Sequence, residues 1–81
     1  MIEKTVTIGT AFETRSAALL VQTAGKFDSN ILIKIDERMA NAKSIMGIIA
    51  LGASQGQTVQ LMINGPDETL AMAALEQFFS A

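Results

Sequence analysis

The stretch NAKSIMGI, Asn41–Ile48, is where the sequence changes from a strand pattern to a helix pattern. Arg38–Ala42, which overlaps its start, is predicted to be a returning strand, and Ser44–Leu51 is predicted to be a short helix. Ser44 is a residue type preferred at a helix N-cap, where the side-chain oxygen accepts a hydrogen bond from a free N–H of the first turn.

A helix as short as Ser44–Leu51 buries one face, which Ile48 and Leu51 can fill. The apolar residues nearer the other side are Ile45, Met46 and Ile49. These three residues belong to the core if the helix is enclosed. If the helix lies at the surface, they form an exposed apolar patch beside Ser44, and the spacing makes this patch plausible.

Before this stretch, the sequence predicts a strand, a helix and a second strand. Ile2–Ile8 alternates apolar and polar residues, as a half-buried strand does. Thr14–Phe27 has apolar residues three and four positions apart, which is typical of an amphipathic helix, and Thr14 is its expected N-cap. Ile31–Ile35 is rich in β-branched residues and predicts the second strand.

Asp36-Glu37 is predicted to turn the chain back as a hairpin, and glutamate at the second position favours a looser or mildly strained turn. After the short helix, Thr58–Asn64 alternates cleanly and predicts the last strand. Asp67 is the expected cap of the final helix, with Glu68 favourable in its first turn. The expected buried stripe of that helix is Ala71, Ala74, Leu75 and Phe78.

The resulting order is β-α-β-β-α-β-α, which predicts an α+β two-layer sandwich with helices covering one face of the sheet. The chain has 81 residues, a length that predicts a single domain over residues 1–81. No internal repeat, linker or low-complexity segment interrupts the pattern.

Composition excludes several classes of function. The chain has no cysteine, and therefore no disulfide scaffold or thiolate metal site, and no histidine, the commonest general base and metal ligand. Its net charge of −2 has no basic run, so we expect no direct nucleic-acid or membrane partner. No signal-like segment and no apolar run of about 18 residues is present. We expect a cytoplasmic protein without a metal or cofactor.

The sequence resembles the HPr family, the small phosphocarrier proteins of the bacterial sugar phosphotransferase system. The resemblance covers essentially the whole chain and is most specific at Ala17-Ala18-Leu19, Val21–Ala24, Lys26–Ser29 and, above all, Asn41–Ile48. It implies an open-faced two-layer sandwich, in which a four-stranded antiparallel sheet carries three helices on one face.

The carrier motif of that family is Gly-Leu-His-Ala-Arg-Pro, whose histidine accepts phosphate from Enzyme I. The matching residues here are Ala11–Ser16, in which only Arg15 agrees and Glu13 occupies the phosphohistidine position. Ser16 stands where the family has proline. The chain therefore looks most similar to the catabolite-repression variants of HPr, which lack the histidine and keep a regulatory serine.

The resemblance implies that Ser44 is phosphorylated by HPr kinase/phosphorylase and that the product docks on a catabolite control transcriptional regulator. It further implies that the docking surface contains Arg15, Ser44, Ile45, Met46 and Ile49. The protein would then be a substrate of an enzyme and not itself an enzyme. Ile49 replaces the methionine usual in the family, and its β-branched side chain is stiffer.

Other interpretations of these residues stay open at the sequence level. Ser44 can be a plain helix cap, and Arg15 a solvated side chain. Glu13 can be a solvated glutamate, an imitation of phosphohistidine next to Arg15, or an acyl-phosphate carrier. Besides the regulatory function, the chain could be an unregulated binding module of the same fold, or a degenerate phosphocarrier that uses Glu13.

Overall fold

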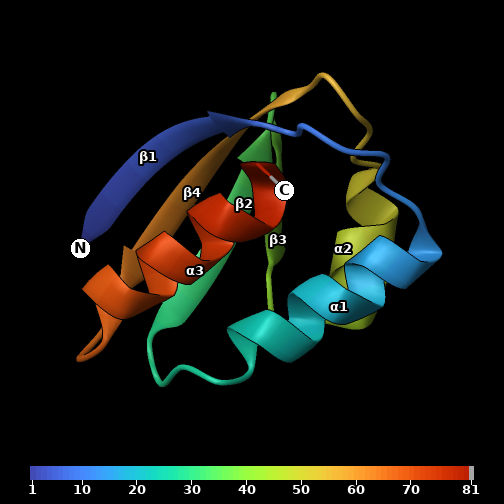
Figure 1. Ribbon diagram of the computed structural model, residues 1–81. Coiled ribbons are helices and arrows are strands. Elements are labelled where there is room, and N and C mark those ends of the chain that lie inside the picture. The colour runs from blue at the N-terminus through green and yellow to red at the C-terminus, as the bar shows by residue number, and fades with distance from the viewer. Residues whose placement is uncertain (81) are drawn as a thin grey trace.

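The structure is a computed structural model, and it describes residues 1–80 of the chain. Its elements follow the predicted order (Figure 1). They are β1 (Ile2–Thr7), α1 (Thr14–Ala24), β2 (Asn30–Ile35), β3 (Arg38–Asn41), α2 (Ile45–Leu51), β4 (Thr58–Asn64) and α3 (Glu68–Ser80). The predicted α+β fold, with four antiparallel strands and three helices, is confirmed. Within residues 1–80, no helix is both long and apolar enough to cross a membrane.

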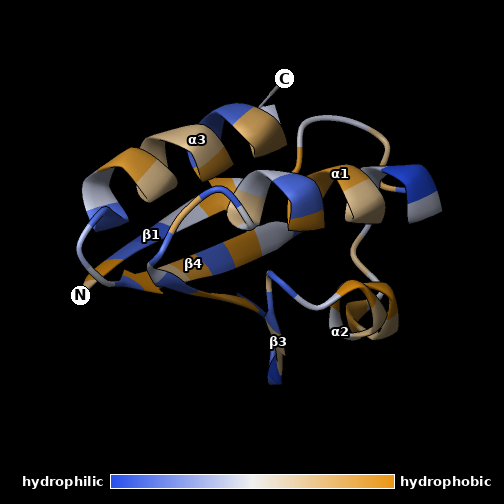
Figure 2. Ribbon diagram, turned by 90° about the horizontal axis from the view of Figure 1, so that it is seen from below, coloured by the Kyte–Doolittle hydropathy of each residue, from blue (hydrophilic) through white to orange (hydrophobic). Residues whose placement is uncertain are grey.

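The four strands lie in the order β1-β4-β2-β3, and every neighbouring pair is antiparallel. The two central strands, β2 and β4, pair Ile33 with Leu61, and both of these side chains are buried. Their neighbours Leu32 and Met62 also pair, but point to the opposite face and are only half-buried. Alternation along the strands thus makes one face of the sheet the core and leaves the other open. Figure 2 shows α1 and α3 over the same face of the sheet, with α2 beside β3.

The helix α3 uses a slightly different face from the predicted one. Its buried residues are Ala71, Met72, Leu75 and Phe79. Ala74 and Phe78, which were expected in this stripe, are half-buried and line a groove towards α1. Because apolar residues lie on nearly all sides of α3, the periodicity alone does not define which side faces the sheet.

The hairpin turn between β2 and β3 is tight, since Ile35 pairs directly with Arg38 across Asp36 and Glu37. Asp36 has a φ of 55°, in the left-handed region. Asp tolerates this conformation better than most non-glycine residues, at a modest cost. The local strain expected from the sequence is therefore carried by Asp36.

Asp67 directly precedes α3, as the sequence predicted for its cap, and its backbone oxygen accepts from the Ala71 N–H at 2.9 Å, but its carboxylate bonds to another loop. Its Oδ2 accepts from the backbone N–H of Asp28 at 2.9 Å, and its Oδ1 accepts from the backbone N–H of Ser29 at 3.0 Å and from the Ser29 hydroxyl. These hydrogen bonds tie the loop before α3 to the loop before β2. The sequence did not predict these hydrogen bonds, because the partners are 38 and 39 residues apart.

Candidate functional site

Ser44 lies at the N-cap of α2, as its sequence context predicted. Its backbone is extended, and its Oγ accepts a hydrogen bond from the Gly47 N–H at 3.2 Å. The preceding turn is closed by Asn41, whose backbone oxygen accepts from the Ser44 N–H at 3.0 Å and whose Oδ1 accepts from the Lys43 N–H at 2.8 Å. Ser44 itself is exposed, so its hydroxyl is accessible while it caps the helix.

The apolar residues of α2 divide between two faces. Ile48 and Leu51 are buried against the core. The exposed ones are Ile45, Met46 and Ile49, which keep 37%, 72% and 44% of their surface accessible, respectively. We call these three residues the α2 patch. The predicted apolar patch beside Ser44 is therefore exposed, on the side of the helix that faces away from the core.

Glu13, and not Thr14, is the N-cap residue of α1. Its backbone is extended and its side chain makes no capping hydrogen bond, because a glutamate side chain is longer than the short caps that reach back to the first turn. The predicted cap at Thr14 is therefore wrong, since Thr14 is already the first helical residue. Within residues 1–80, Glu13 and Arg15 form no ion pair, and both side chains are exposed.

A hollow of about 240 Å³ lies between the start of α1 and α2. Glu13 and Ile49 both line it, so the structure brings Glu13 next to the α2 patch. Arg15, Ile45 and Met46 are exposed but do not line this hollow. Glu13 and Ile49, which come from two separate sequence motifs, thus lie on one surface, because α1 packs against α2.

Phe12 is a residue of this region that the sequence reasoning did not single out. It is half-buried, stacks on Phe79 at a centroid distance of 6.3 Å, and lines the hollow next to Glu13. Its one sequence signal is that it is the only aromatic residue in the connection from β1 to α1, directly before Glu13. No group of three or more acidic or metal-binding side chains within residues 1–80 is placed to hold a metal ion.

The comparisons with known proteins agree on one family. A family model described as "PTS HPr component phosphorylation site" matches residues 2–81. The phosphocarrier protein HPr of Treponema pallidum is 43% identical over 81 residues, covering 98% of this chain and 92% of that protein. The HPr-like protein Crh of Halalkalibacterium halodurans is 45% identical over 80 residues, covering 96% and 95%.

Solved structures extend this similarity to the fold. A crystal structure of a phosphocarrier protein HPr from Bacillus anthracis superposes with a TM-score of 0.92 at 35% identity, covering 96% of this chain and 95% of that one. Carrier proteins and Crh-type relatives thus stand at similar distances from this sequence.

Proposed function

The chain belongs to the HPr family of phosphocarrier and regulatory proteins, and on this premise we propose that it is a regulatory protein of carbon catabolite control. The proposal starts from the absence of histidine anywhere in the sequence. Glu13 occupies the position of the phosphohistidine, and a carboxylate does not form the phosphoramidate that partner enzymes transfer. Phosphoryl transfer through histidine is therefore excluded for this chain.

The observation that carries the proposal is the exposed Ser44 hydroxyl beside the exposed α2 patch. In the proposed mechanism, HPr kinase/phosphorylase transfers phosphate from ATP to Ser44. The phosphoserine adds about −1.5 to −2 charges at the start of α2 and presents an anion to a basic side chain of the partner. The modified protein then docks on a catabolite control regulator through phosphorylated Ser44, Arg15 and the α2 patch.

Intact mass after incubation with HPr kinase/phosphorylase and ATP tests the first step. We expect one added phosphate on the wild type and none on Ser44→Ala. Ser54→Ala is the matched control, because the Ser54 hydroxyl makes no hydrogen bond within residues 1–80 and lies outside the motif. A folded wild-type protein that takes no phosphate would leave Ser44 as a helix cap and overturn the proposal. The fallback would be an unregulated binding module that uses the same patch.

A second candidate function is favoured by the similar identities to a carrier protein and to Crh. Here Glu13 would itself accept the phosphoryl group as an acyl phosphate, since its carboxylate is exposed and unused in capping. Incubation with Enzyme I and phosphoenolpyruvate separates the two candidates. A hydroxylamine-labile phosphate that disappears in Glu13→Gln would support the carrier, and its absence would leave the regulatory function alone.

A further inference from the structure

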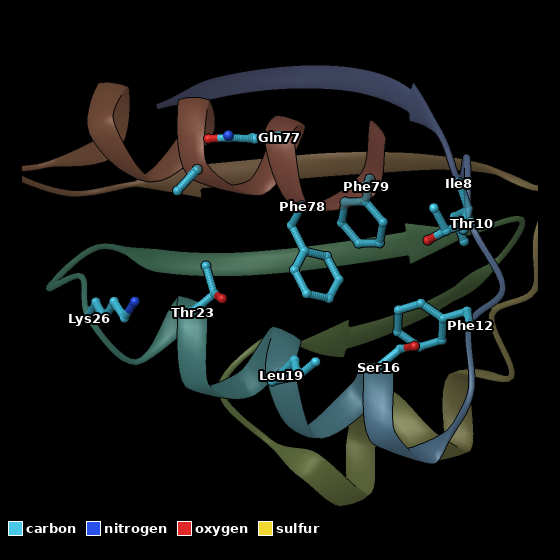
Figure 3. Close-up of a pocket in the computed structure, with 11 residues that line it drawn as sticks. Ile8, Thr10, Phe12, Ser16, Leu19, Thr23, Lys26, Gln77, Phe78 and Phe79 are labelled. Carbon is cyan, nitrogen blue, oxygen red and sulfur yellow. The ribbon is translucent and has the colours of Figure 1, made fainter. Parts of the chain in front are cut away.

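A second, larger hollow lies away from the α2 patch, between α1 and α3, and has a volume of about 470 Å³ (Figure 3). We call it the α1–α3 groove. One wall is a stripe of α1 and its flanks, at positions 12, 16, 19, 23 and 26. This three-and-four spacing places the side chains in a row along one side of the helix. The other wall is the second half of α3, including Ala74 and Phe78.

The middle of the α1–α3 groove is apolar and partly open to solvent. Leu19 keeps 46% of its surface exposed, and Phe12 and Phe78 are half-buried. Phe78 packs edge-on against Phe79 at a centroid distance of 5.4 Å, which holds the floor of the groove in place. A pocket of this volume, lined by aliphatic and aromatic side chains together with several polar ones, is in the range of pockets that bind small molecules.

One end of the α1–α3 groove carries a positive charge. Lys26 lies just beyond the end of α1 and is the only charged residue among those of the described chain that line the groove. Its ammonium makes no ion pair or hydrogen bond within residues 1–80. Figure 3 places Thr23 between Lys26 and the aromatic rings. From Phe78 to Lys26 the lining therefore changes from apolar to polar to cationic, while Thr10 and Ser16 line the other end, beside Phe12.

We propose that the α1–α3 groove binds a free, linear aliphatic carboxylate, with the chain along Leu19 and Phe78 and the carboxylate at Lys26. Charge complementarity selects the carboxylate, because Lys26 is the one charge that the described lining offers. The apolar rings favour the chain by removing it from water. Ser44 and the α2 patch do not line this groove, so the proposal does not depend on phosphorylation.

Decanoate, kept below its micelle concentration, is a suitable probe for the unphosphorylated wild-type protein. Because the chain has no tryptophan or tyrosine, binding is best followed by NMR, through amide and methyl shifts. We expect saturable shifts at Leu19, Thr23 and Ala74, and none at Met46. Decanol, without the charge, should bind about two- to fivefold more weakly, in keeping with the modest strength of an exposed ion pair.

Two variants locate the ligand. Lys26→Gln should weaken decanoate about two- to fivefold and leave decanol unchanged, with Lys34→Gln, on the open face of the sheet, as the matched control. Leu19→Glu should weaken decanoate roughly tenfold by combining lost apolar contact with like-charge repulsion. Met39→Glu is its control, since Met39 is 53% exposed on β3 and outside the groove.

Three results with decanoate and decanol would overturn the proposal. They are the absence of saturable binding, shifts centred on the α2 patch instead of the α1–α3 groove, and equal affinity of the wild type for decanoate and decanol. A positively charged decyltrimethylammonium that bound as well as decanoate would have the same meaning. Each variant is checked for folding by its methyl spectrum before titration, so a loss of binding is not confused with a loss of structure.

Discussion

Ser44 combines two properties that its neighbours in sequence determine. Its Oγ caps α2 through Gly47, and its exposure leaves the same oxygen accessible. The capping role could be predicted from the sequence because it is local: the serine and the N–H that it satisfies are three residues apart. Recognition of this oxygen by a kinase depends on a partner surface and is therefore not determined by the residues next to Ser44.

Ser44→Ala should therefore lower the free energy of unfolding by about 1 kcal/mol, because the Gly47 N–H loses its acceptor. Urea denaturation followed by far-ultraviolet circular dichroism measures this loss. Ser44→Asp keeps an acceptor and should recover most of it. Ser54→Ala, a serine whose hydroxyl makes no hydrogen bond in the described chain, should stay within about 0.5 kcal/mol of the wild type. Equal losses in the two alanine variants would contradict the capping role.

The role of Asp67 depends on pH. The hydrogen bond from the Ser29 hydroxyl, followed by the one from the Asp28 N–H, holds the pKa of Asp67 below its ordinary value of 3.8. A carboxyl with a lowered pKa in the folded state stabilises the protein above its ordinary pKa. That stabilisation is lost as the pH falls through the lowered value.

Asp67→Asn should accordingly differ most from the wild type near neutral pH, and the difference in unfolding free energy should shrink as the pH falls below the ordinary value of 3.8. Urea denaturation at a series of pH values measures it. Asp28→Asn controls for the change in net charge, since the Asp28 carboxylate accepts no hydrogen bond within residues 1–80. A difference that stays constant in acid would show that the Asp67 hydrogen bonds do not depend on its charge.

At the scale of elements, the start of α3 is held against the loop before β2 by close packing as well as by Asp67. A Cβ on Gly65 would lie 2.5 Å from the Cα and the Oγ of Ser29, closer than real side chains approach. Ser29 is fully buried and cannot move aside. The glycine is therefore required by the approach of two loops, a requirement that neither loop shows in its own sequence.

Gly65→Ala should destabilise the protein by about 1–3 kcal/mol more than Gly56→Ala, because a new methyl group is forced into a filled site. Gly56 is the matched control. It also has a positive φ, of 91°, but a Cβ added there would meet nothing within 4 Å, so its variant carries only the backbone cost. Thermal and urea denaturation of both variants measure the difference. Equal destabilisation would mean that the Ser29 contact relaxes at no cost.

The same contrast between local and distant causes explains which elements were predicted well. The short helix α2, with its cap and its two faces, follows from residues within one turn of each other, and its predicted bounds were accurate. In α3, where apolar residues occur on most sides, the packing of β1 and β4 selects the buried face, and the prediction at Ala74 and Phe78 was wrong. The cap of α1 was misplaced by one residue for a similar reason, since Glu13 precedes the helix without bonding to it.

At the scale of the whole molecule, the fold class was predictable and the arrangement of its surfaces was not. Alternation and helical spacing give the seven elements, but the order β1-β4-β2-β3 is set by tertiary pairing. That order and the helix packing place Phe12 between the two hollows, the one at Glu13 and the α1–α3 groove. The connection from β1 to α1 thus joins two surfaces, of which the sequence predicted only the one at Glu13 and α2.

Phe12→Ala should affect both surfaces at once. Removing the half-buried ring, with its stacking on Phe79, should lower the free energy of unfolding by about 1–3 kcal/mol. The methyl signals of Ile49 in one hollow and Ala74 in the other should both shift, since Phe12 is a wall of each. Phe12→Leu keeps an apolar side chain and should lose less. Leu70→Ala, at a residue that is 68% exposed and lines neither hollow, should leave both signals in place. A shift confined to one side would show that the two surfaces respond independently, in spite of the residue that they share.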